Sequence, residues 1–266
     1  MTNHPAHDAL VQEVRSWYIQ DYPALGKVVE RRRFGYYSRI QQTNYNDVHI
    51  VEPFDPAQTS AFNADVNAFY GQRRVLIFTH SQAVDRQLSC ALKQAGCTRG
   101  TAKLYLAHVD TCVSPAAELG PAQIEPVTRS NLLDYTITKL KAFADSEEEP
   151  GQAAVEASMA TRRADLNADG AFLIARVRDQ AAAIIGWYEG ADRYIFNLAT
   201  RTPFRNQGIA RQLLSRVIAD SYAQGKRSLV IATDPADTPV QLYRRMGFLD
   251  EIYWMGTWIL DGSSAR

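Results

Sequence analysis

A short stretch toward the end of the chain, PFRNQGIARQLL at residues 203–214, places two arginines and a glycine around the start of an amphipathic run. The helix predicted over 209–224 has one apolar stripe facing a sheet, which consists of Ile209, Leu213, Leu214, Val217 and Ile218. The first backbone N–H groups of a helix have no partner within it, and the helix dipole is positive at that end. The turn is therefore predicted to bind an anion.

The side chains at this turn favour a phosphate or a pyrophosphate. Gly208 and the small Ala210 let a bulky anion approach the backbone, and Arg205 and Arg211 can add charge-assisted contacts. A helix start with an incidental glycine is the alternative. The stretch contains neither GxGxxG nor GxxxxGK[ST], so dinucleotide and nucleoside-triphosphate binding are not supported.

The elements around this turn predict an α/β fold in the second half of the chain. The expected strands lie at 124–127, 171–177, 182–189, 193–200 and 228–233, and the expected helices at 130–144, 153–166, 209–224 and 238–245. The aromatic tail at 248–260 is expected to supply one or two closing strands. Because this order mixes hairpins with crossovers, we expect a mixed central sheet with flanking helices.

Two segments share one layout, which indicates an internal repeat. Residues 73–97 and 226–248 each contain a basic pair, an apolar strand, a polar gap and a helix that ends in glycine. We therefore predict two domains of one architecture in tandem, at 1–113 and 122–266, joined by a linker at 114–121 that is rich in Pro, Gly and Ala. An unrelated α/β domain in the first half is the alternative, because strand–helix–glycine runs are common.

Composition argues against several classes of function. The chain has 29 basic and 29 acidic residues and no net charge, so nothing favours a nucleic-acid partner, even at the basic and aromatic run ERRRFGYYSR at 30–39. No apolar run approaches the roughly 18 residues that span a bilayer, and no leader segment is visible, so we expect a cytoplasmic protein without a membrane partner. The three cysteines lack metal-ligand spacing, and no metal is expected.

Two motifs in the second half resemble a known enzyme family. R-N-Q-G-I-A at 205–210 is similar to the Q/R-x-x-G-x-G/A signature of the GCN5-related N-acetyltransferases (GNAT), and L-Y-R-R-M-G-F at 242–248 is similar to their L-Y-x-x-x-G-F helix. The motifs occur in the family's order, with a buried strand between them. The resemblance covers residues 122–260. The first half resembles a degenerate domain of the same kind, because it lacks both the loop and the tyrosine.

The resemblance implies an acyl-CoA N-acyltransferase fold, and transfer of an acyl group, most simply from acetyl-CoA, to a primary amine that attacks the thioester directly. It implies that the donor's pyrophosphate is held by Arg205, Asn206, Gln207, Gly208, Ile209, Ala210 and Arg211. The exposed edge of the strand at 193–200 is expected to pair with the pantetheine amides at Leu198, Ala199 and Thr200. A backbone N–H there would polarise the thioester carbonyl.

The resemblance also makes Tyr243 the candidate general acid for the thiolate leaving group, with packing of its ring as the alternative. The proton acceptor stays open, because the strand at 193–198 holds no carboxylate and all five histidines lie in the first half. The candidates are Glu189 and Asp192 at an expected solvent-exposed hairpin tip, a chain of waters, with Asn197 as a residue that could orient one, and a residue of the first domain.

The sequence also leaves the identity of the acceptor amine undecided. The acidic run at 147–149 could attract a cationic amine, or it could simply be a solvated surface. We expect a small-molecule amine as the acceptor, and a monomer or a homodimer. Two other functions are compatible with the sequence. One is a non-catalytic acyl-CoA sensor, which the missing carboxylate would fit. The other is an acyltransferase whose donor is bound to a carrier protein.

Overall fold

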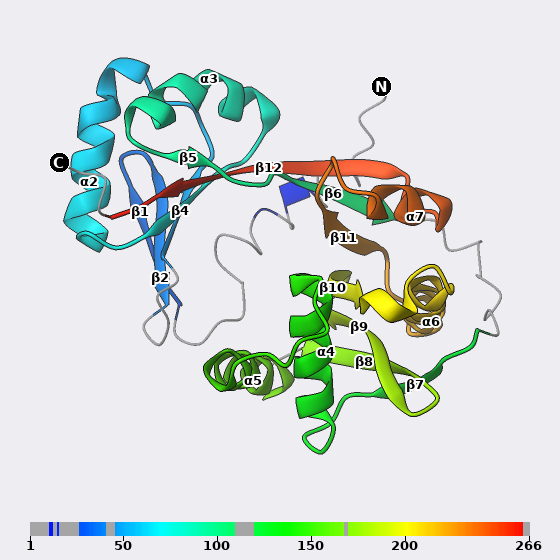
Figure 1. Ribbon diagram of the computed structural model, residues 1–266. Helices are drawn as coiled ribbons and strands as arrows, with labels where there is room; N and C mark the ends of the chain where they lie inside the picture. Colours follow the sequence, from blue (N-terminus) through cyan, green and yellow to red (C-terminus); the bar gives the residue numbers. More distant parts are fainter. Residues whose placement is uncertain are drawn as a thin grey trace. The chain divides into compact units, whose positions relative to one another are not determined.

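The computed structural model of the chain describes residues 11, 12, 15, 27–40, 46–109, 120–167 and 170–262 (Figure 1). The chain divides into two compact units. Unit 1 consists of Met1–Tyr105, Thr233–Asp237 and Glu251–Arg266, and unit 2 consists of Leu106–Ala232 and Thr238–Asp250. Each unit therefore combines segments that are distant in the sequence, and the strand β6 (Lys103–His108) has residues in both.

Unit 2 is built on a mixed sheet in the strand order β7-β8-β9-β10-β11. These strands are β7 (Gln123–Pro126), β8 (Gly170–Val177), β9 (Gln180–Tyr188), β10 (Arg193–Thr200) and β11 (Leu229–Thr233). Neighbours are antiparallel from β7 to β10, whereas β10 and β11 are parallel. The mixed sheet that the sequence predicts is therefore confirmed.

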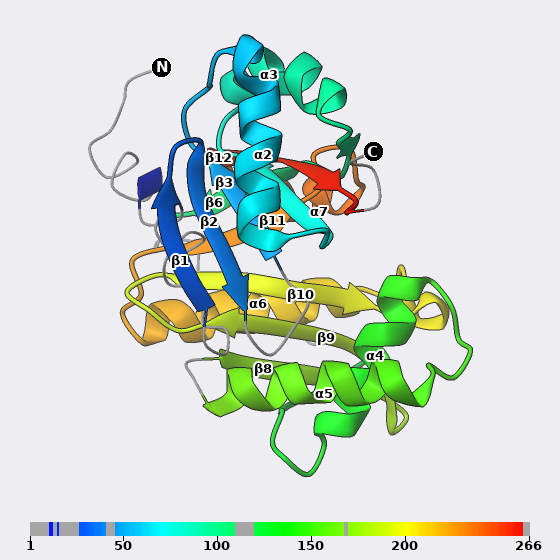
Figure 2. The ribbon, with the colours of Figure 1, turned by 90° about the vertical axis from the view of Figure 1, so that its left-hand side faces the viewer.

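Helices cover both faces of this sheet. The helices α4 (Leu132–Ala144) and α5 (Gln152–Asn167) lie on one face, and α6 (Ile209–Ala223) lies on the other (Figure 2). The strand β9 is buried over residues 182–188, as expected of a strand between two helical layers. Under α4 and α5 lies a core cluster that includes Val127, Leu132, Tyr135, Phe172, Ile174 and Ile184.

The helix α6 carries the apolar stripe that the sequence predicts. All five residues of the stripe are at most 1% exposed. Burying an aliphatic side chain of this size contributes roughly 1.5–3 kcal/mol, so the stripe fixes α6 firmly to the sheet. A short 3₁₀ helix, η3 (Thr202–Phe204), and a four-residue loop at 205–208 connect β10 to α6. This anchored helix positions the loop.

Unit 1 also contains a mixed sheet, in the strand order β1-β2-β3-β4-β12. The strands are β1 (Lys27–Arg32), β2 (Gly35–Ile40), β3 (Asn46–Ile50), β4 (Val75–Thr79) and β12 (Asp250–Leu260), and the short β5 (Thr98–Arg99) pairs with β12. The neighbours β3 and β4 are parallel, and the other neighbours are antiparallel.

The helices of unit 1 pack on this sheet through one core cluster. The short η2 (Pro56–Gln58) leads into α2 (Thr59–Tyr70), and β4 leads into α3 (Gln82–Gln94). Trp258 of β12 is 1% exposed, and its indole N–H donates to the Asp85 carboxylate at 2.8 Å. The cluster includes Tyr37, Val48, Ile50, Phe62, Val66, Ile77, Leu88, Leu92 and Trp258.

The two segments that the sequence pairs as a repeat end their helices in the same way, and the repeat itself stays a prediction. The helix α3 ends before Gly96 (φ +87°), where the Cys97 N–H donates to the Leu92 carbonyl at 2.9 Å. The helix α7 (Pro239–Arg245) ends before Gly247 (φ +93°), where the Phe248 N–H donates to the Tyr243 carbonyl at 3.0 Å. Both are glycine-terminated caps of the same kind. Leu92 and Tyr243 therefore occupy equivalent positions in these two caps.

The C-terminal tail departs from its expected place. The sequence placed residues 248–260 in the second domain, but residues 251–266 belong to unit 1, because β12 pairs with β4 from Gly256 to Leu260. The hairpin of β1 and β2 was not predicted, and the basic run at 30–39 lies within it. The linker expected at 114–121 falls outside the described residues, apart from its last two. The domain bounds otherwise stay a prediction.

No helix within the described ranges has both the length and the apolar character needed to cross a membrane.

Candidate active site

The loop before α6 leaves the start of that helix uncapped. Asn206 (φ +60°) and Gly208 (φ +79°) both adopt left-handed backbone conformations. Gly208 is the N-cap residue, and no side chain makes a capping hydrogen bond there. The first bond within the helix runs from the Gln212 N–H to the Gly208 carbonyl at 2.9 Å. The preceding N–H groups of Ile209 and Ala210 therefore stand at the positive end of the helix dipole, as an anion site requires.

Gly208 matters through its conformation and through the space above it. A φ of +79° is unfavourable for residues with a side chain, by roughly 1 kcal/mol or more. A Cβ atom placed there would meet nothing within 4 Å. The backbone of Gly208 therefore faces open space that a ligand can enter, in agreement with the predicted approach of an anion.

The strand β10 is interrupted beside this loop. Its parallel ladder with β11 joins Arg193–Ile195 to Leu229–Ile231 and, in the described chain, goes no further. Its register with β9 shifts between Phe196 and Ala199, which is a β-bulge, and Asn197 at the bulge has a φ of +53°. On the side of β11, residues 197–200 therefore form an open strand edge.

The predicted edge residues divide into two groups. Leu198 and Ala199 lie on the segment that β11 does not pair with. The carbonyl of Thr200, by contrast, accepts a hydrogen bond from Arg205 Nε at 3.1 Å. The open backbone that could pair with another amide chain is therefore centred on Leu198 and Ala199.

A pocket of about 470 Å³ lies beside the bulge. Asn197 lines it from β10, and the helix α4 lines it with Lys139, Leu140, Phe143 and Ala144. Phe143 is 59% exposed, which is unusual for a side chain of this size. The pocket is therefore an apolar surface with two polar groups, a side-chain amide and an ammonium.

Tyr243, the predicted proton donor, lies on α7 and is 5% exposed. Its ring packs edge-on against Phe248, with the ring centroids 6.3 Å apart. The packing that the sequence left as an alternative is therefore present. A role of the hydroxyl group in proton transfer stays a prediction.

The comparison with protein families decides what this unit is. Residues 168–249 match the family model described as an acetyltransferase (GNAT) domain. Unit 2 contains a GNAT domain. The match ends one residue before the last residue of unit 2, and it leaves out β12. The matched region therefore includes the loop at 205–208, the interrupted strand β10 and Tyr243. At a general level, the match identifies an acyltransferase.

Solved structures resemble the whole chain in fold. A functionally unknown conserved protein from Staphylococcus epidermidis aligns with a TM-score of 0.73 at 13% identity, covering 91% of this chain and 96% of its own. A GCN5-related N-acetyltransferase from Kribbella flavida gives 0.61 at 15%, covering 97% and 96%. A tandem GNAT protein from the clavulanic acid biosynthesis pathway gives 0.60 at 10%, covering 96% and 89%. No curated protein matches the sequence. The predicted fold is confirmed.

Arg205 has partners within the protein, and its contact with a diphosphate stays a prediction. Its guanidinium donates to the Ala142 carbonyl at 3.3 Å and pairs with the Asp145 carboxylate at 2.8 Å. A hydrogen bond from Thr202, and then the charge of Arg205, holds the pKa of Asp145 below its usual range. Arg205 therefore ties the GNAT loop to the end of α4. Gln207 is also engaged locally, because its amide donates to the Pro203 carbonyl at 3.1 Å.

The acidic run after α4 is largely neutralised. Glu147 pairs with Arg201, and Glu149 pairs with Lys141. Within the run, Glu148 is exposed and has no ion pair to another described residue. The run therefore contributes little net charge, and its contact with an acceptor stays a prediction.

The two carboxylates near the β9–β10 turn are engaged by basic residues. Asp192 was expected at a solvent-exposed tip, which is wrong: it is 3% exposed and accepts from Arg227 at 2.6 Å and from Ser228 at 2.8 Å. Burial alone would raise the pKa of Glu189, but hydrogen bonds from Trp187 and Arg193 outweigh it and lower that pKa. Neither carboxylate is suited to accept a proton from an amine.

Sequence reasoning missed a buried polar cluster between α5 and the sheet. Arg162 and Asp165 form an ion pair at 2.8 Å with side chains 7% and 5% exposed, and the Tyr188 hydroxyl donates to Asp165 at 3.1 Å. Burial raises the pKa of Asp165, although Arg162 and Tyr188 oppose it. One signal was present: Arg162 stands at helical spacing between Met159 and Leu166, on the apolar side of α5.

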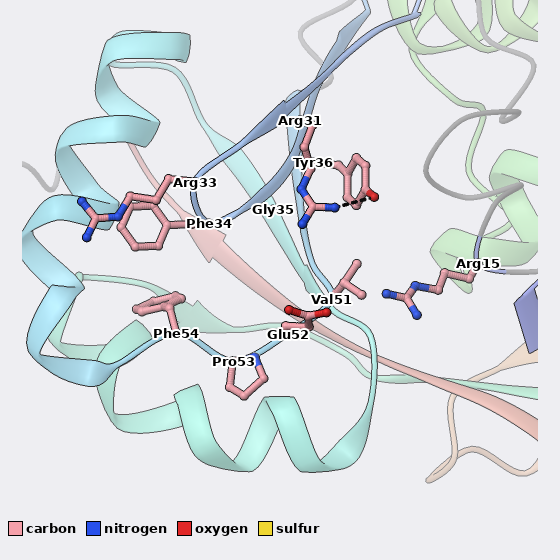
Figure 3. A pocket seen from close by; sticks show the side chains of 10 residues that line it. All are labelled: Arg15, Arg31, Arg33, Phe34, Gly35, Tyr36, Val51, Glu52, Pro53 and Phe54. Carbon is pink, nitrogen blue, oxygen red and sulfur yellow. Dashed lines mark hydrogen bonds between the residues drawn. The ribbon is translucent and has the colours of Figure 1, made fainter.

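Unit 1 contains a smaller pocket of about 140 Å³ at the turn between β1 and β2 (Figure 3). Two of the three arginines that line it contact aromatic side chains: Arg31 donates to the Tyr36 hydroxyl at 2.7 Å, and the Arg33 guanidinium lies 5.0 Å from the centre of the Phe34 ring. The pocket contains none of the predicted site residues. In the described part of the chain, no three His, Cys, Asp or Glu side chains gather as metal ligands.

Proposed function

We propose that the GNAT domain transfers an acyl group, acetyl in the simplest case, from acyl-coenzyme A to the nitrogen of a small-molecule primary amine. One observation carries the proposal: an uncapped helix start at Gly208 and an open strand edge at Leu198 and Ala199 occur in one strand–loop–helix segment. The helix start suits a diphosphate and the strand edge suits a chain of amides. Coenzyme A has both, joined in one molecule.

The donor is bound mainly by backbone groups in this proposal. The N–H groups of Ile209 and Ala210 hold the diphosphate at the positive end of α6. Leu198 and Ala199 pair with the pantetheine amides as an additional strand would. A backbone N–H at the bulge then donates to the thioester oxygen, where negative charge develops during attack.

The amine nitrogen attacks the thioester carbonyl carbon directly. A C–N bond forms, the C–S bond breaks, and the thiolate leaves with the electron pair. Tyr243 is our candidate to protonate that thiolate, and Asn197 is our candidate to orient the acceptor or a water beside it. Holding the two reactants together can by itself supply a large part of the rate acceleration.

The test combines donor binding with turnover. Titration calorimetry with coenzyme A and acetyl-CoA measures binding, and release of free thiol from acetyl-CoA reports transfer to a panel of alkyl amines, amino acids and peptides. We expect both donors to bind and at least one amine to accelerate thiol release. Binding without release for any amine would favour the sensor. Release only from an acylated carrier protein would favour the carrier-bound donor. If coenzyme A does not bind, the site assignment is wrong.

A further inference from the structure

Lys139 has an unusual position for a lysine on α4. It lines the pocket beside Asn197 together with Leu140, Phe143 and Ala144. In the described ranges, no hydrogen bond or ion pair holds its ammonium group. Lys141, two residues further along the same helix, has its charge matched by Glu149. Lys139 is therefore the lysine of α4 that combines a place in the pocket with an unmatched charge.

The groups that face Lys139 do little to keep it charged. From α5 it faces the Arg162 cation and the Asp165 carboxylate, which is already paired with Arg162 and hydrogen-bonded by Tyr188 of β9. From β10, the segment Phe196–Thr200 contributes no titratable side chain. One turn earlier on α4, Tyr135 is fully buried, and burial raises the pKa of its hydroxyl group.

These surroundings favour the neutral amine form of Lys139. Burial, and then the nearby Arg162, lowers the pKa of Lys139 to about 8, although Asp165 opposes the shift. A lysine in solution titrates near 10.4, so at pH 8 it would be almost fully protonated. In this site roughly half of the molecules carry a neutral Lys139 at pH 8.

We propose that Lys139 is the base that removes the proton from the acceptor amine in the pocket beside Asn197. This role rests on the proposed acyl transfer. The lone pair of Lys139 Nζ takes a proton from the bound R–NH₃⁺, and the neutral R–NH₂ attacks the thioester carbonyl carbon. The C–N bond forms and the C–S bond breaks. Tyr243 gives its hydroxyl proton to the thiolate, and the second proton of the nitrogen restores the Tyr243 hydroxyl group. Lys139 then releases its proton to water, so that the products are the amide, free coenzyme A thiol and one proton.

The structure favours Lys139 over the other candidates. Glu189 is held by Trp187 and Arg193 with a lowered pKa, and Asp192 is buried against Arg227 and Ser228. Asn197 cannot accept a proton at neutral pH. Of these groups, Lys139 alone has a lone pair available near neutral pH and a place in the pocket.

The first experiment is a pH profile of kcat/KM, with the amine that gives the fastest thiol release. For the wild type we expect kcat/KM to rise through pH about 8, the pKa of Lys139. Lys139→Gln should lower kcat/KM at pH 8 roughly 100-fold and move the rise to the pKa of the amine, near 10. Lys139→Arg should lower kcat/KM at pH 8 by a similar factor, because a guanidinium keeps the positive charge but does not deprotonate. Lys141→Gln, the matched control, should keep the wild-type profile.

The second experiment does not depend on turnover. Lysine labelled with ¹³C at the ε-carbon allows each lysine to be titrated by NMR, and the Lys139 signal is the one missing from Lys139→Arg. We expect its midpoint at about pH 8. A midpoint near 10.5 would overturn the role of Lys139, whether or not an amine substrate has been found.

The two proposals fail in different ways. A wild-type protein that releases no thiol with any amine contradicts the proposed function. A wild-type protein that releases thiol, with a Lys139→Gln variant of unchanged rate and profile, contradicts only the role of Lys139. Full activity of Lys139→Arg would also contradict it, because positive charge would then be the useful property.

Discussion

The two units use the same chain path at equivalent places but build different local structures on it. In unit 1 the path runs from β3 through η2 and α2 to the parallel strand β4, and in unit 2 from β10 through η3 and α6 to the parallel strand β11. Each path is therefore strand, 3₁₀ helix, α-helix and parallel strand. What differs is whether the helix start and the strand edge are left open.

The segment before the helix of unit 1 is capped by the chain itself. The Asp55 carboxylate accepts from the Ala57 N–H at 2.9 Å, and the Thr59 hydroxyl donates to the Pro56 carbonyl at 2.6 Å. The N-cap residue of α2 itself, Gln58, has no side-chain capping bond, but η2 runs into α2 without a loop, so Asp55 caps the start of the continuous η2–α2 segment. In unit 2 a loop at 205–208 separates η3 from α6, and the N-cap residue of α6, Gly208, has no side-chain cap. The start of α6 therefore has its own N–H donors open to an external anion, whereas the helical segment of unit 1 begins at a carboxylate of the protein.

The parallel strands β3 and β4 of unit 1 stay paired along the shared length that the structure describes and leave no open edge between them. The β3–β4 ladder pairs Asp47–Ile50 with Leu76–Thr79, and the His80 N–H extends it with a bond to the Ile50 carbonyl at 3.1 Å. No bulge interrupts it in the described residues, and β3 is buried throughout. Similar topology therefore does not suffice for a donor site. The proposed donor site needs parallel strands that part and a helix start without a cap, and within the described chain unit 2 alone combines the two.

The largest effect is expected from giving unit 2 the carboxylate that unit 1 already has. Gly208→Asp places a negative charge at the helix start, in the space that is now open. We expect the Kd for coenzyme A, measured by calorimetry, to rise at least roughly 100-fold, or about 2.7 kcal/mol.

The control for backbone strain is Gly225→Asp at the other end of α6. Gly225 also has a positive φ, +73°, and open space around its Cβ position. This variant should bind coenzyme A like the wild type. Equal affinities for the wild type and Gly208→Asp would mean that the diphosphate is bound elsewhere.

The next effect concerns the buried polar groups that each unit contains. Unit 1 has a chain in which Asp47 contacts His49 at 3.0 Å and His49 contacts His80 at 2.8 Å, whereas unit 2 has the ion pair of Arg162 and Asp165. Asp165→Asn leaves the buried Arg162 without a counter-charge. We expect the free energy of unfolding, measured with urea, to fall by about 3 kcal/mol.

An exposed pair provides the matched control for that variant. Asp220 pairs with Arg216 on α6 at 2.7 Å, with side chains 38% and 56% exposed. Asp220→Asn should change the free energy of unfolding by no more than about 0.5 kcal/mol. If both variants lost a similar free energy of unfolding, the buried pair would contribute no more to the stability of unit 2 than the exposed pair does.

A third effect concerns the position where unit 1 has Leu92 and unit 2 has Tyr243. Tyr243→Phe keeps the ring packed against Phe248 and removes the hydroxyl group. If that hydroxyl protonates the thiolate, kcat should fall roughly 100-fold, or about 2.7 kcal/mol, with the Kd of the donor unchanged. Parallel changes in kcat, donor affinity and thermal stability would identify Tyr243 as a packing residue, like its counterpart Leu92.

Local patterns predicted a large part of unit 2. The stripe of α6, the order of strands and helices over 122–248 and the glycine with positive φ at 208 all depend on residues close together in the sequence. The β1–β2 hairpin was missed because its turn consists of Arg33 and Phe34 rather than a glycine-containing pair. The charges of the run at 30–39 also conceal the buried Phe34 and Tyr37.

Features that depend on distant segments could not be read in this way. The alternation of apolar and polar residues within 250–260 indicates a strand, but it does not predict that this strand pairs with β4. Lys139 resembles a surface lysine in sequence, and only the fold brings Arg162 of α5 close enough to disfavour its charge. Asp192 was expected in solvent because it follows a turn, yet Arg227 and Ser228 bury it.

The smallest effect tests how the loop of unit 2 is kept open. The sequence gives Arg205 a contact with the diphosphate, whereas in the structure it ties the loop to α4 through Asp145, in a pair whose side chains are 42% and 67% exposed. A pair so exposed contributes at most about 1 kcal/mol. Arg205→Met should therefore raise the Kd for coenzyme A less than about 5-fold, and the dependence of the Kd on salt should not change.

The opposite outcome has a distinct signature. If Arg205 leaves Asp145 when the donor binds and contacts the diphosphate, one charge-assisted hydrogen bond of about 1.5–3 kcal/mol is lost in the variant. The Kd would then rise roughly tenfold or more, and binding would become less sensitive to salt. Calorimetry of the wild type and Arg205→Met at several NaCl concentrations separates the two cases. Arg211→Met, on the first turn of α6, shows the salt response when a cation is removed at the helix start itself.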